Sequence, residues 1–340
     1  MSRPSVVLGF SGGMDSATAV GKLRDAEYDV VAVTLDTLGD EKMLQCAQAR
    51  ARELGVLHVV KDVREAFKES IIQYFADSYM AGRTPAPCTV CNSAIKWKYL
   101  LEEADRLGVD AIATGHYFNI EQHNGRYYVA RAKDSRKDQS YYLWGLSQEV
   151  LKRALTPMGD VIKEEVKRNF ADKRESMGLC FLAGMGYREY MEQNYPAAVR
   201  EGDIVDMAGE VVGRHSGVAF YTIGQKRGLD VNRSGVCIVG IDAENNRLVV
   251  GENKYLYHEV LEMEDCNIID VEEFMTSGDV SVVIRGIGRN PEGFMRRAEV
   301  TDCGYRIYLN DPAWAPAAGQ PVVFYRQNRV IGGGILKRYY

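Results

Sequence analysis

The stretch SVVLGFSGGMDS, residues 5–16, joins a strand-like segment to a helix through two glycines. Its first six residues are apolar or small, as in a buried strand. Residues from Asp15 to Ala26 carry helical periodicity, with Ala17, Val20 and Leu23 on one face. Glycines at the junction let the backbone turn tightly and approach an anion closely. Because a helix N-terminus offers unpaired N–H groups, the stretch predicts a phosphate-binding loop.

The loop differs from the Walker pattern, which places a lysine and a serine or threonine after a second glycine. Here an aspartate, Asp15, stands in the loop, and Ser11 and Ser16 add hydroxyl donors. The plain alternative is a helix capped by serine or aspartate after a glycine turn. The strand before the loop and the helix after it favour the phosphate loop.

Strand and helix patterns continue to alternate along the first third of the chain. Strand-like runs occur at 30–35, 56–60 and 110–113, and helical runs at 43–54, 66–80 and 93–107. Strands separated by helices predict an α/β fold with a doubly wound parallel sheet. Ligands of such sheets bind beyond the carboxyl ends of the strands.

The pattern changes near residues 147 and 201, and a second β-unit begins near Val260, which predicts four segments in all. Residues 1–146 form a nucleotide-binding catalytic domain and residues 147–200 a charged, helical central segment. Residues 201–259 form a small β domain, with a turn at Asn245-Asn246, and residues 260–340 a C-terminal β-barrel.

Composition sets broad limits on the function. The chain has 340 residues, of which 46% are hydrophobic and 26% charged, with a net charge of −5. This balance argues against a protein that coats nucleic acid nonspecifically. No apolar run is long enough to span a membrane, and the N-terminus lacks the pattern of a signal peptide, so we expect a cytoplasmic protein. The seven cysteines do not form a secreted disulfide framework.

Several further motifs, taken together and in order, resemble the tRNA-specific 2-thiouridylase family. The loop at residues 11–16 is similar to the pyrophosphate loop of the ATP pyrophosphatase superfamily. The resemblance spans nearly the whole chain and rests also on the segments RTPAPCTVCN (83–92), ATGHY (113–117), KDQSYYL (137–143), ESMGLCF (175–181), YTIGQKRGL (221–229) and AGQPVVFY (318–325).

The resemblance implies a tRNA sulfurtransferase of adenine nucleotide hydrolase-like fold. Such an enzyme uses ATP with Mg to adenylate O2 of the wobble uridine in the anticodon arm of tRNA. A persulfide sulfur, supplied by a sulfur-donating protein, then displaces AMP. Cys91 matches the family's nucleophile and Cys180 its persulfide carrier. In the family one of these two cysteines carries the persulfide, and the other helps to release the sulfur or closes a disulfide with it. Lys96 and a helix start after Cys91 are expected to lower the pKa of its thiol.

The resemblance also implies binding residues, position by position. The ATP-binding positions are Gly9, Phe10, Ser11, Gly12, Gly13, Met14, Asp15, Ser16, Leu35 and Gly115. The tRNA-binding positions are His116, Lys137, Asp138, Gln139, Arg285 and Gln320, although the neighbours of Arg285 differ from the family pattern. We expect a group of cations to meet RNA phosphates: Lys226, Arg227, Arg285, Arg296 and Arg297. Without the family pattern, residues 137–139 are interpreted as a solvated turn. The linker before Cys180 is short against the family, so the resemblance implies a loop there that orders only with tRNA.

One departure concerns the mechanism. The family pattern before the nucleophile is Asn-Pro-Asp, and here it is Ala86-Pro87-Cys88. The base-holding amide and the carboxylate are therefore lost. The replacement creates Cys88-x-x-Cys91, which with Cys180 gives three thiols able to hold a [4Fe–4S] cluster. The alternatives are a redox pair, a zinc site and an inert extra thiol.

Two other functions compete with the thiolating enzyme. Another adenylating synthetase of the same superfamily would need no paired cysteines at the sheet edge. A non-catalytic tRNA-binding protein would need no intact phosphate loop. The residues at 11–16 and the two cysteines Cys91 and Cys180 favour the thiolating enzyme over both.

Overall fold

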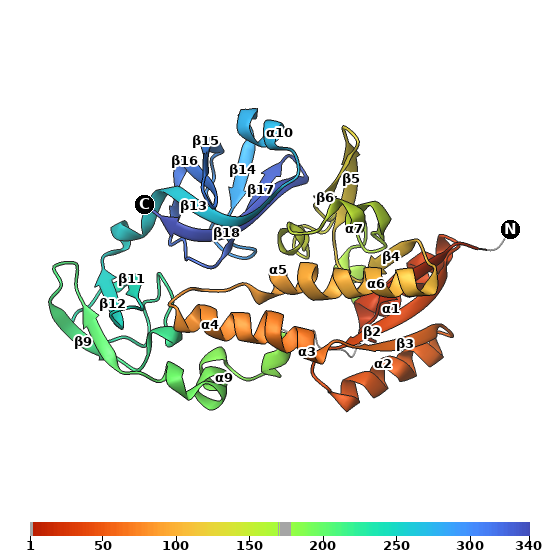
Figure 1. Cartoon of the computed structure of the whole chain (residues 1–340), viewed down its shortest axis with the longest axis horizontal. Helices are drawn as coiled ribbons and strands as arrows, with labels where there is room; N and C mark the ends of the chain where they lie inside the picture. The colour runs from red at the N-terminus through yellow and green to blue at the C-terminus, as the bar shows by residue number, and fades with distance from the viewer. Residues whose placement is uncertain (1–2, 169, 171–177) are drawn as a thin grey trace. The chain divides into compact units, whose positions relative to one another are not determined.

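The computed structural model describes residues 3–168, 170 and 178–340. The chain divides into two compact units (Figure 1). Unit 1 comprises residues 1–71, 88–176 and 328–331, and unit 2 comprises residues 72–87, 177–327 and 332–340. The four-segment division drawn from the sequence stays a prediction. The loop that is predicted just before Cys180 lies largely at residues 169 and 171–177, outside the described residues.

Unit 1 is built on a five-stranded sheet whose neighbouring strands all run parallel. Its strands are β1 (Ser5–Gly9), β2 (Asp29–Asp36), β3 (Leu57–Asp62), β4 (Ala111–Thr114) and β7 (Ala154–Leu155), in the order β3-β2-β1-β4-β7. The order reverses its direction of growth between β1 and β4, which is where ligands bind in such sheets. The predicted α/β fold is confirmed.

Helices connect these strands, and apart from α5 they fall close to the helical runs that the sequence predicts. They are α1 (Met14–Asp25), α2 (Glu41–Glu53), α3 (Arg64–Phe67), α4 (Tyr74–Met80), α5 (Pro87–Cys91), α6 (Lys98–Leu107), α7 (Gln148–Arg153) and α8 (Lys163–Arg168). A π-helical turn at Lys68–Gln73 joins α3 to α4, and a second at Asn92–Trp97 joins α5 to α6. The predicted runs 66–80 and 93–107 are thus helical throughout, with local widening that the periodicity does not reveal.

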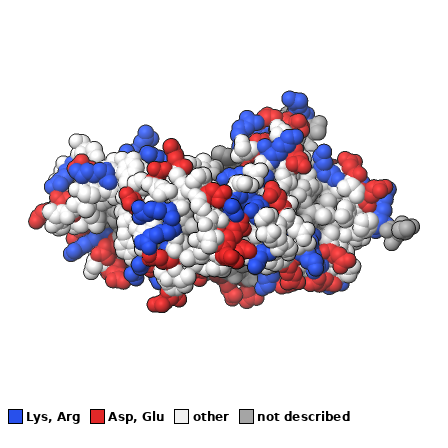
Figure 2. Space-filling view, turned by 90° about the horizontal axis from the view of Figure 1, so that it is seen from above, with Lys and Arg blue, Asp and Glu red and all other residues white. Residues whose placement is uncertain are grey.

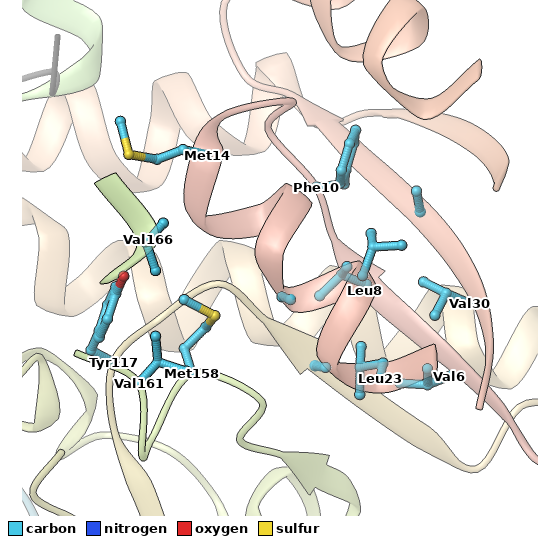
Figure 3. Close-up of a cluster of buried hydrophobic side chains, with 14 of the residues drawn as sticks. Val6, Leu8, Phe10, Met14, Leu23, Val30, Tyr117, Met158, Val161 and Val166 are labelled. Atoms are coloured by element: carbon cyan, nitrogen blue, oxygen red, sulfur yellow. The ribbon is translucent and has the colours of Figure 1, made fainter. Parts of the chain in front are cut away.

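The core of unit 1 forms where α1 and the central strand pack together (Figure 3). Val6, Val7 and Leu8 of β1 are fully buried because a central parallel strand is covered on both faces. Leu23 of α1 and Met158, after β7, belong to the same buried cluster. This packing fixes the strand end and the helix start that flank the glycine loop.

Two elements of unit 1 were not predicted from the sequence. A hairpin consists of β5 (Asn119–His123) and β6 (Arg126–Ala130). Its turn residues, Asn124 and Gly125, have φ of 49° and 74°, as the Asn-Gly pair of a two-residue hairpin turn requires. The other element is β7, which joins the sheet beside β4 within the segment 147–200 that was expected to be helical.

Unit 2 contains a five-stranded sheet in the order β10-β9-β8-β12-β11. The strands are β8 (Gly202–Val205), β9 (Val211–His215), β10 (Asp230–Val231), β11 (Cys237–Asp242) and β12 (Arg247–Gly251). The predicted turn at Asn245-Asn246 joins β11 to β12, with φ of 53° at Asn246. The helix α9 (Tyr187–Asn194) precedes this sheet in the chain.

The other sheet of unit 2 orders its strands β14-β17-β18-β13-β16-β15. The elements are β13 (Tyr257–Ile268), α10 (Val271–Thr276), β14 (Val280–Val283), β15 (Met295–Thr301), β16 (Gly304–Trp314), β17 (Pro321–Arg326) and β18 (Arg329–Tyr339). The first residues of β18 belong to unit 1, where Arg329 pairs with Ala130 of β6. Two β-rich modules after the α/β sheet are therefore confirmed.

The surface carries charges of both signs. On the face that Figure 2 shows, Lys and Arg side chains are interspersed with Asp and Glu side chains. Among the described residues, no helix has the length and apolar character needed to cross a membrane.

Candidate functional site

The phosphate loop between β1 and α1 depends on glycine at position 12. Gly12 has φ of +72°, and a Cβ built there would lie 2.7 Å from the Cα of Ala47 in α2. Both the conformation and the space exclude a larger side chain. The loop can therefore turn closely under α2 only with this residue.

The start of α1 is open to an anion. Gly13 is the N-cap residue in an extended conformation, and among the described residues no side chain caps this helix end. The Ser16 hydroxyl donates to the Gly13 carbonyl at 3.0 Å, and the Gly13 N–H donates to Ser11 Oγ at 3.3 Å. The two hydroxyl oxygens of Ser11 and Ser16 lie 3.4 Å apart. These contacts shape a nest of donors at a positive helix end, as phosphate binding requires.

Neighbouring strands bring further predicted residues to the same sheet edge. Gly115 follows β4, and a Cβ built on it would lie 3.0 Å from the backbone nitrogen of Ser16. Gly9, at the end of β1, packs against Leu100, whose Cδ1 would lie 2.9 Å from an added Cβ. Leu35 is the penultimate residue of β2, beside β1, and is partly buried. The predicted ATP-binding residues thus cluster at the switch point of the sheet.

Two residues that the sequence analysis missed bind Asp15 of the loop. The Lys163 ammonium donates to both carboxylate oxygens of Asp15, at 2.6 and 2.7 Å, and the Tyr117 hydroxyl donates to Oδ1 at 2.7 Å. Lys163 is only 3% exposed. No sequence signal singles it out, because it stands in a charged helical run 148 residues after Asp15.

His116, which directly follows Gly115, is held in a neutral state. Its Nδ1 lies 2.8 Å from the Thr114 hydroxyl. The pKa of His116 falls to about 3, chiefly because burial disfavours the charged ring and also because the Lys96 ammonium repels it. The ring can therefore exchange hydrogen bonds with a base without carrying charge near neutral pH.

The segment 137–139 is tied to His116 through its neighbour Tyr117. Gln139 donates its backbone N–H to the Tyr117 carbonyl at 2.9 Å and accepts the Tyr117 N–H on its side-chain oxygen at 2.9 Å. Gln139 is therefore fixed against the residue that follows His116, and the assignment of both residues to tRNA contacts stays a prediction. Lys137, next along the segment, is partly buried.

Asp138 has an internal role. Its carboxylate accepts the N–H of Ala132 at 2.8 Å and both the N–H and the hydroxyl of Ser140, at 3.3 and 2.6 Å. It also forms an ion pair with Arg131 at 3.7 Å. A carboxylate with these partners fixes the shape of the segment that presents Lys137 and Gln139.

Cys88 and Cys91 lie on one helix. The expectation that a helix starts after Cys91 is wrong, because α5 begins at Pro87 and runs on through the π-helical turn into α6. Proline suits this first helical position, which then places Cys88 in the first turn. Cys91 is 6% exposed and Cys88 is exposed. A separation of three residues puts both thiols on the same side of the helix.

The surroundings of these thiols are partly polar. Asn92, 2% exposed, donates from its side-chain amide to the carbonyl of Tyr142 at 3.0 Å. Burial, and next the charge of Cys88, raise the pKa of Tyr142. The KDQSYYL segment, residues 137–143, therefore reaches the Cys88-x-x-Cys91 helix within unit 1.

Cys180 belongs to unit 2. It opens a short 3-10 turn, Cys180–Leu182, and is exposed. The next residue, Phe181, is buried and packs edge-on against Phe75 at 5.1 Å and against Tyr190 at 5.6 Å between ring centroids. These aromatic contacts fix the position of the turn, and the Cys180 thiol beside them is exposed. Residues 175–177 of this motif lie outside the described residues.

Two predicted tRNA-contacting residues lie in the larger sheet module of unit 2. The Arg285 guanidinium packs over the Trp314 ring at 5.2 Å and donates to the Ala315 carbonyl. Gln320 precedes β17, and its side-chain oxygen is buried without a hydrogen-bond partner among the described residues. Of the other expected cations, Arg296 and Arg297 lie over the Tyr308 ring, and Lys226 and Arg227 are exposed.

No disulfide bond joins any of the described cysteines. Within the described part of the chain, no group of three or more His, Cys, Asp or Glu side chains is arranged to hold a metal ion. A hollow of about 710 Å³ in unit 1 is lined by residues 62–66, Glu69 and Tyr99 and by none of the loop residues 9–16. The hollow is therefore not the candidate nucleotide site.

Comparisons with known proteins agree with this geometry. A family model described as a tRNA methyl transferase HUP domain matches residues 4–184, and one described as a tRNA methyl transferase PRC-barrel domain matches residues 188–252. The chain is 38% identical to the tRNA-specific 2-thiouridylase MnmA 1 of Bacteroides fragilis, over 97% of this chain and 96% of the relative. It is 38% identical to MnmA 2 of Phocaeicola vulgatus, over 98% of each. It is 34% identical to MnmA of Clostridium acetobutylicum, over 98% of this chain and 99% of that one.

Proposed function

We propose that this chain, which belongs to the tRNA-specific 2-thiouridylase family, is an ATP-dependent tRNA sulfurtransferase of the cytoplasm. It replaces O2 of the wobble uridine by sulfur and gives 2-thiouridine, AMP and pyrophosphate. The observation that carries the proposal is the uncapped N-terminus of α1 behind Gly12, with the Ser11 and Ser16 hydroxyls beside it. Methyl transfer, which the descriptions of the family models name, requires no such phosphate site.

The first step is adenylation. The backbone and hydroxyl donors of residues 9–16 bind the ATP phosphates, with Gly115 and Leu35 against the nucleotide. Mg supplied with ATP offsets phosphate charge. The uridine O2 attacks the α-phosphorus, and the bond to the β-phosphate oxygen breaks, so that pyrophosphate leaves. The activated carbon C2 then carries AMP as a leaving group.

The second step delivers sulfur. A sulfur-donating protein places a persulfide on Cys180, and the terminal sulfur attacks C2 as AMP leaves. Cys91 then attacks the Cys180 sulfur, which forms a Cys91–Cys180 disulfide and frees the thiolated base. The exposure of Cys180 supports access by a protein donor, and the burial of Cys91 supports a role inside the base pocket.

The tRNA is held by groups in both units. His116, Lys137 and Gln139 supply contacts from unit 1, and Asp138 fixes the segment that carries two of them. Arg285 and Gln320 supply contacts from unit 2. The buried side-chain oxygen of Gln320, which has no protein partner among the described residues, supports a polar contact to the anticodon arm.

The test separates adenylation from sulfur transfer. Purified protein is given ATP, Mg, an anticodon-arm transcript and a persulfide donor, and pyrophosphate and 2-thiouridine are both measured. We expect Cys91→Ala and Cys180→Ala to release pyrophosphate with tRNA but to form no 2-thiouridine. Cys46→Ala, on the exposed side of α2, is the control and should do both. Pyrophosphate release that does not depend on tRNA would favour a different adenylating synthetase. No pyrophosphate release at all would favour a non-catalytic binding protein.

The Cys88-x-x-Cys91 pair favours a second route for the sulfur. Cys88 and Cys91 supply two thiolates from one helix face, and Cys180 would supply the third ligand of a [4Fe–4S] cluster from unit 2. In that route the three thiolates would hold the cluster, its open iron would supply sulfide, and no persulfide on Cys180 would be needed. Anaerobic purification followed by iron analysis decides: loss of iron and of thiolation together in Cys88→Ala supports the cluster. An iron-free protein with full activity contradicts it.

A further inference from the structure

The loop at residues 9–16 has no cation of its own, and it contains an acid. Residues 9–16 include no lysine or arginine, whereas Asp15 places a carboxylate in the first turn of α1. A carboxylate stabilises a bare helix N-terminus, but it repels an incoming triphosphate at the same place. Something must therefore offset the charge of Asp15 when a polyphosphate binds.

A lysine from another helix supplies the positive charge that offsets Asp15. Lys163, the first residue of α8, reaches both oxygens of Asp15 at 2.6 and 2.7 Å. Its ammonium also lies 5.6 Å from the centroid of the Tyr117 ring. The helices α1 and α8 pack together, and Met14, Tyr117 and Val166 share one buried cluster (Figure 3). The lysine is thus delivered through apolar packing to the phosphate end of α1.

Burying this ammonium is expensive unless a charged partner stays beside it. A lysine that is 3% exposed loses most of its hydration, and only short, charge-assisted contacts compensate that loss. In the free protein Asp15 provides them. A phosphate oxygen at the same helix end can take its place, so the lysine can exchange one anion for another without becoming unpaired.

The position of Lys163 is set by a second carboxylate. Asp134, 4% exposed, accepts the backbone N–H of Lys163 at 3.0 Å and the N–H of Arg136 at 3.2 Å. The pKa of Asp134 is lowered, first by the hydrogen bond from the Lys163 N–H and further by the contacts with Arg136. Because the start of α8 is fixed in this way, the Lys163 side chain is directed toward the first turn of α1.

We propose that Lys163 is the cation of the phosphate site, the counterpart of the lysine that a Walker loop carries within itself. It pairs with Asp15 in the free protein and with the departing pyrophosphate of bound ATP during adenylation. As O2 of the uridine bonds to the α-phosphorus and the bond to the β-phosphate oxygen breaks, the electron pair goes to pyrophosphate, whose charge Lys163 meets. This inference rests on the proposed function for the reaction, but not for the binding of ATP.

The experiment measures ATP binding to the full chain by titration calorimetry, in the absence of tRNA. We expect Lys163→Met to bind ATP at least about tenfold more weakly, since a charge-assisted contact to phosphate is lost. Lys163→Arg keeps the charge and should recover part of the affinity. Lys167→Met, in the same helix and 42% exposed, is the matched control and should bind as the unchanged protein does.

A purely structural ion pair gives a different pattern. If Lys163 only neutralises Asp15, then Asp15→Asn should restore the affinity of the Lys163→Met variant to that of Asp15→Asn alone. Our proposal expects the double variant to remain at least about tenfold weaker than Asp15→Asn. Thermal unfolding of each variant shows whether the fold survives, and the Lys163→Arg variant keeps the test valid if Lys163→Met unfolds.

The outcomes distinguish this inference from the proposed function. Equal ATP affinity of Lys163→Met and the unchanged protein overturns the inference, whatever the result of the thiolation assay. Weakened ATP binding in Lys163→Met together with no 2-thiouridine from the unchanged protein upholds the inference and removes the proposed function.

Discussion

Gly12 shows how a single residue fixes the candidate site. Its φ of +72° and the 2.7 Å that would separate an added Cβ from Ala47 leave no room for a side chain. We expect Gly12→Ala to destabilise the fold by more than about 2 kcal/mol and to weaken ATP binding. Urea unfolding and ATP titration measure both effects.

Gly21 provides the control for this change. It lies on the exposed side of α1, and a Cβ added there meets nothing within 4 Å. Gly21→Ala should stabilise the protein by about 0.5–1 kcal/mol because glycine is unfavourable inside a helix. Equal effects of the two substitutions would contradict the role given to the loop geometry.

His116 connects the same region to pH. Its pKa of about 3 in the folded protein lies below the ordinary value of 6.5. Between these two values the unfolded chain binds a proton that the folded chain does not, so stability rises with pH through this window and is lost as pH falls. We expect His116→Gln to remove up to about 1.4 kcal/mol per pH unit from that slope.

Urea unfolding between about pH 4 and pH 6, which lie inside this window, measures the slope for the unchanged protein and for His116→Gln. The NMR titration of the imidazole gives the pKa directly. A ring that protonates near its ordinary value, or a slope that the substitution leaves intact, contradicts the account of His116.

At the scale of elements, the segment 132–140 is shaped by one carboxylate. Asp138 accepts hydrogen bonds from Ala132 and Ser140, so its loss leaves partly buried donors without their acceptor. We expect Asp138→Ala to cost about 1–3 kcal/mol of stability and also to weaken tRNA binding. Lys137→Ala should weaken tRNA binding with little change in stability. Two variants that lose stability equally would show that the segment is not organised by Asp138.

The sequence predicts the elements of unit 1 well where the signal is periodic and apolar. β1 to β4 and the helices between them follow from runs such as Val30 to Leu35. β7 is missed because two residues, Ala154 and Leu155, carry no period. The hairpin at 119–130 is missed because polar residues dominate β5, although the Asn124-Gly125 pair is a usable turn signal.

The candidate site divides in the same way. The loop and the family motifs are readable because their residues are contiguous. Lys163, Tyr117 and Asp134 are not readable, because each acts on a partner far away in the chain through packing that only the fold creates. The sequence identifies Asp138 as a residue of interest, but it does not show that the Asp138 carboxylate bonds inward to Ala132 and Ser140. The helix start at Pro87 also escapes, because the sequence does not show that the turn continues through Cys91.

At the scale of the whole molecule, the net charge is −5 and charges of both signs are interspersed. Binding of tRNA should therefore rest on a few placed cations and weaken as salt rises. We expect Arg296→Ala to lower the slope of log affinity against log salt by about 0.7–0.9. Lys254→Ala, whose ammonium is paired with Glu252 at 2.9 Å, should leave the slope unchanged. A reversed order of the two effects would remove Arg296 from the RNA-binding surface.

The most direct test of the central claim is thionucleoside analysis of tRNA from cells that lack this protein. We predict that 2-thiouridine disappears and that the unchanged protein restores it, whereas Cys91→Ala and Cys180→Ala do not. If Cys88→Ala also fails to restore 2-thiouridine, the three-cysteine cluster is favoured. If Cys88→Ala restores it, the persulfide route is favoured. Wild-type levels of 2-thiouridine in tRNA from cells that lack the protein would contradict the account.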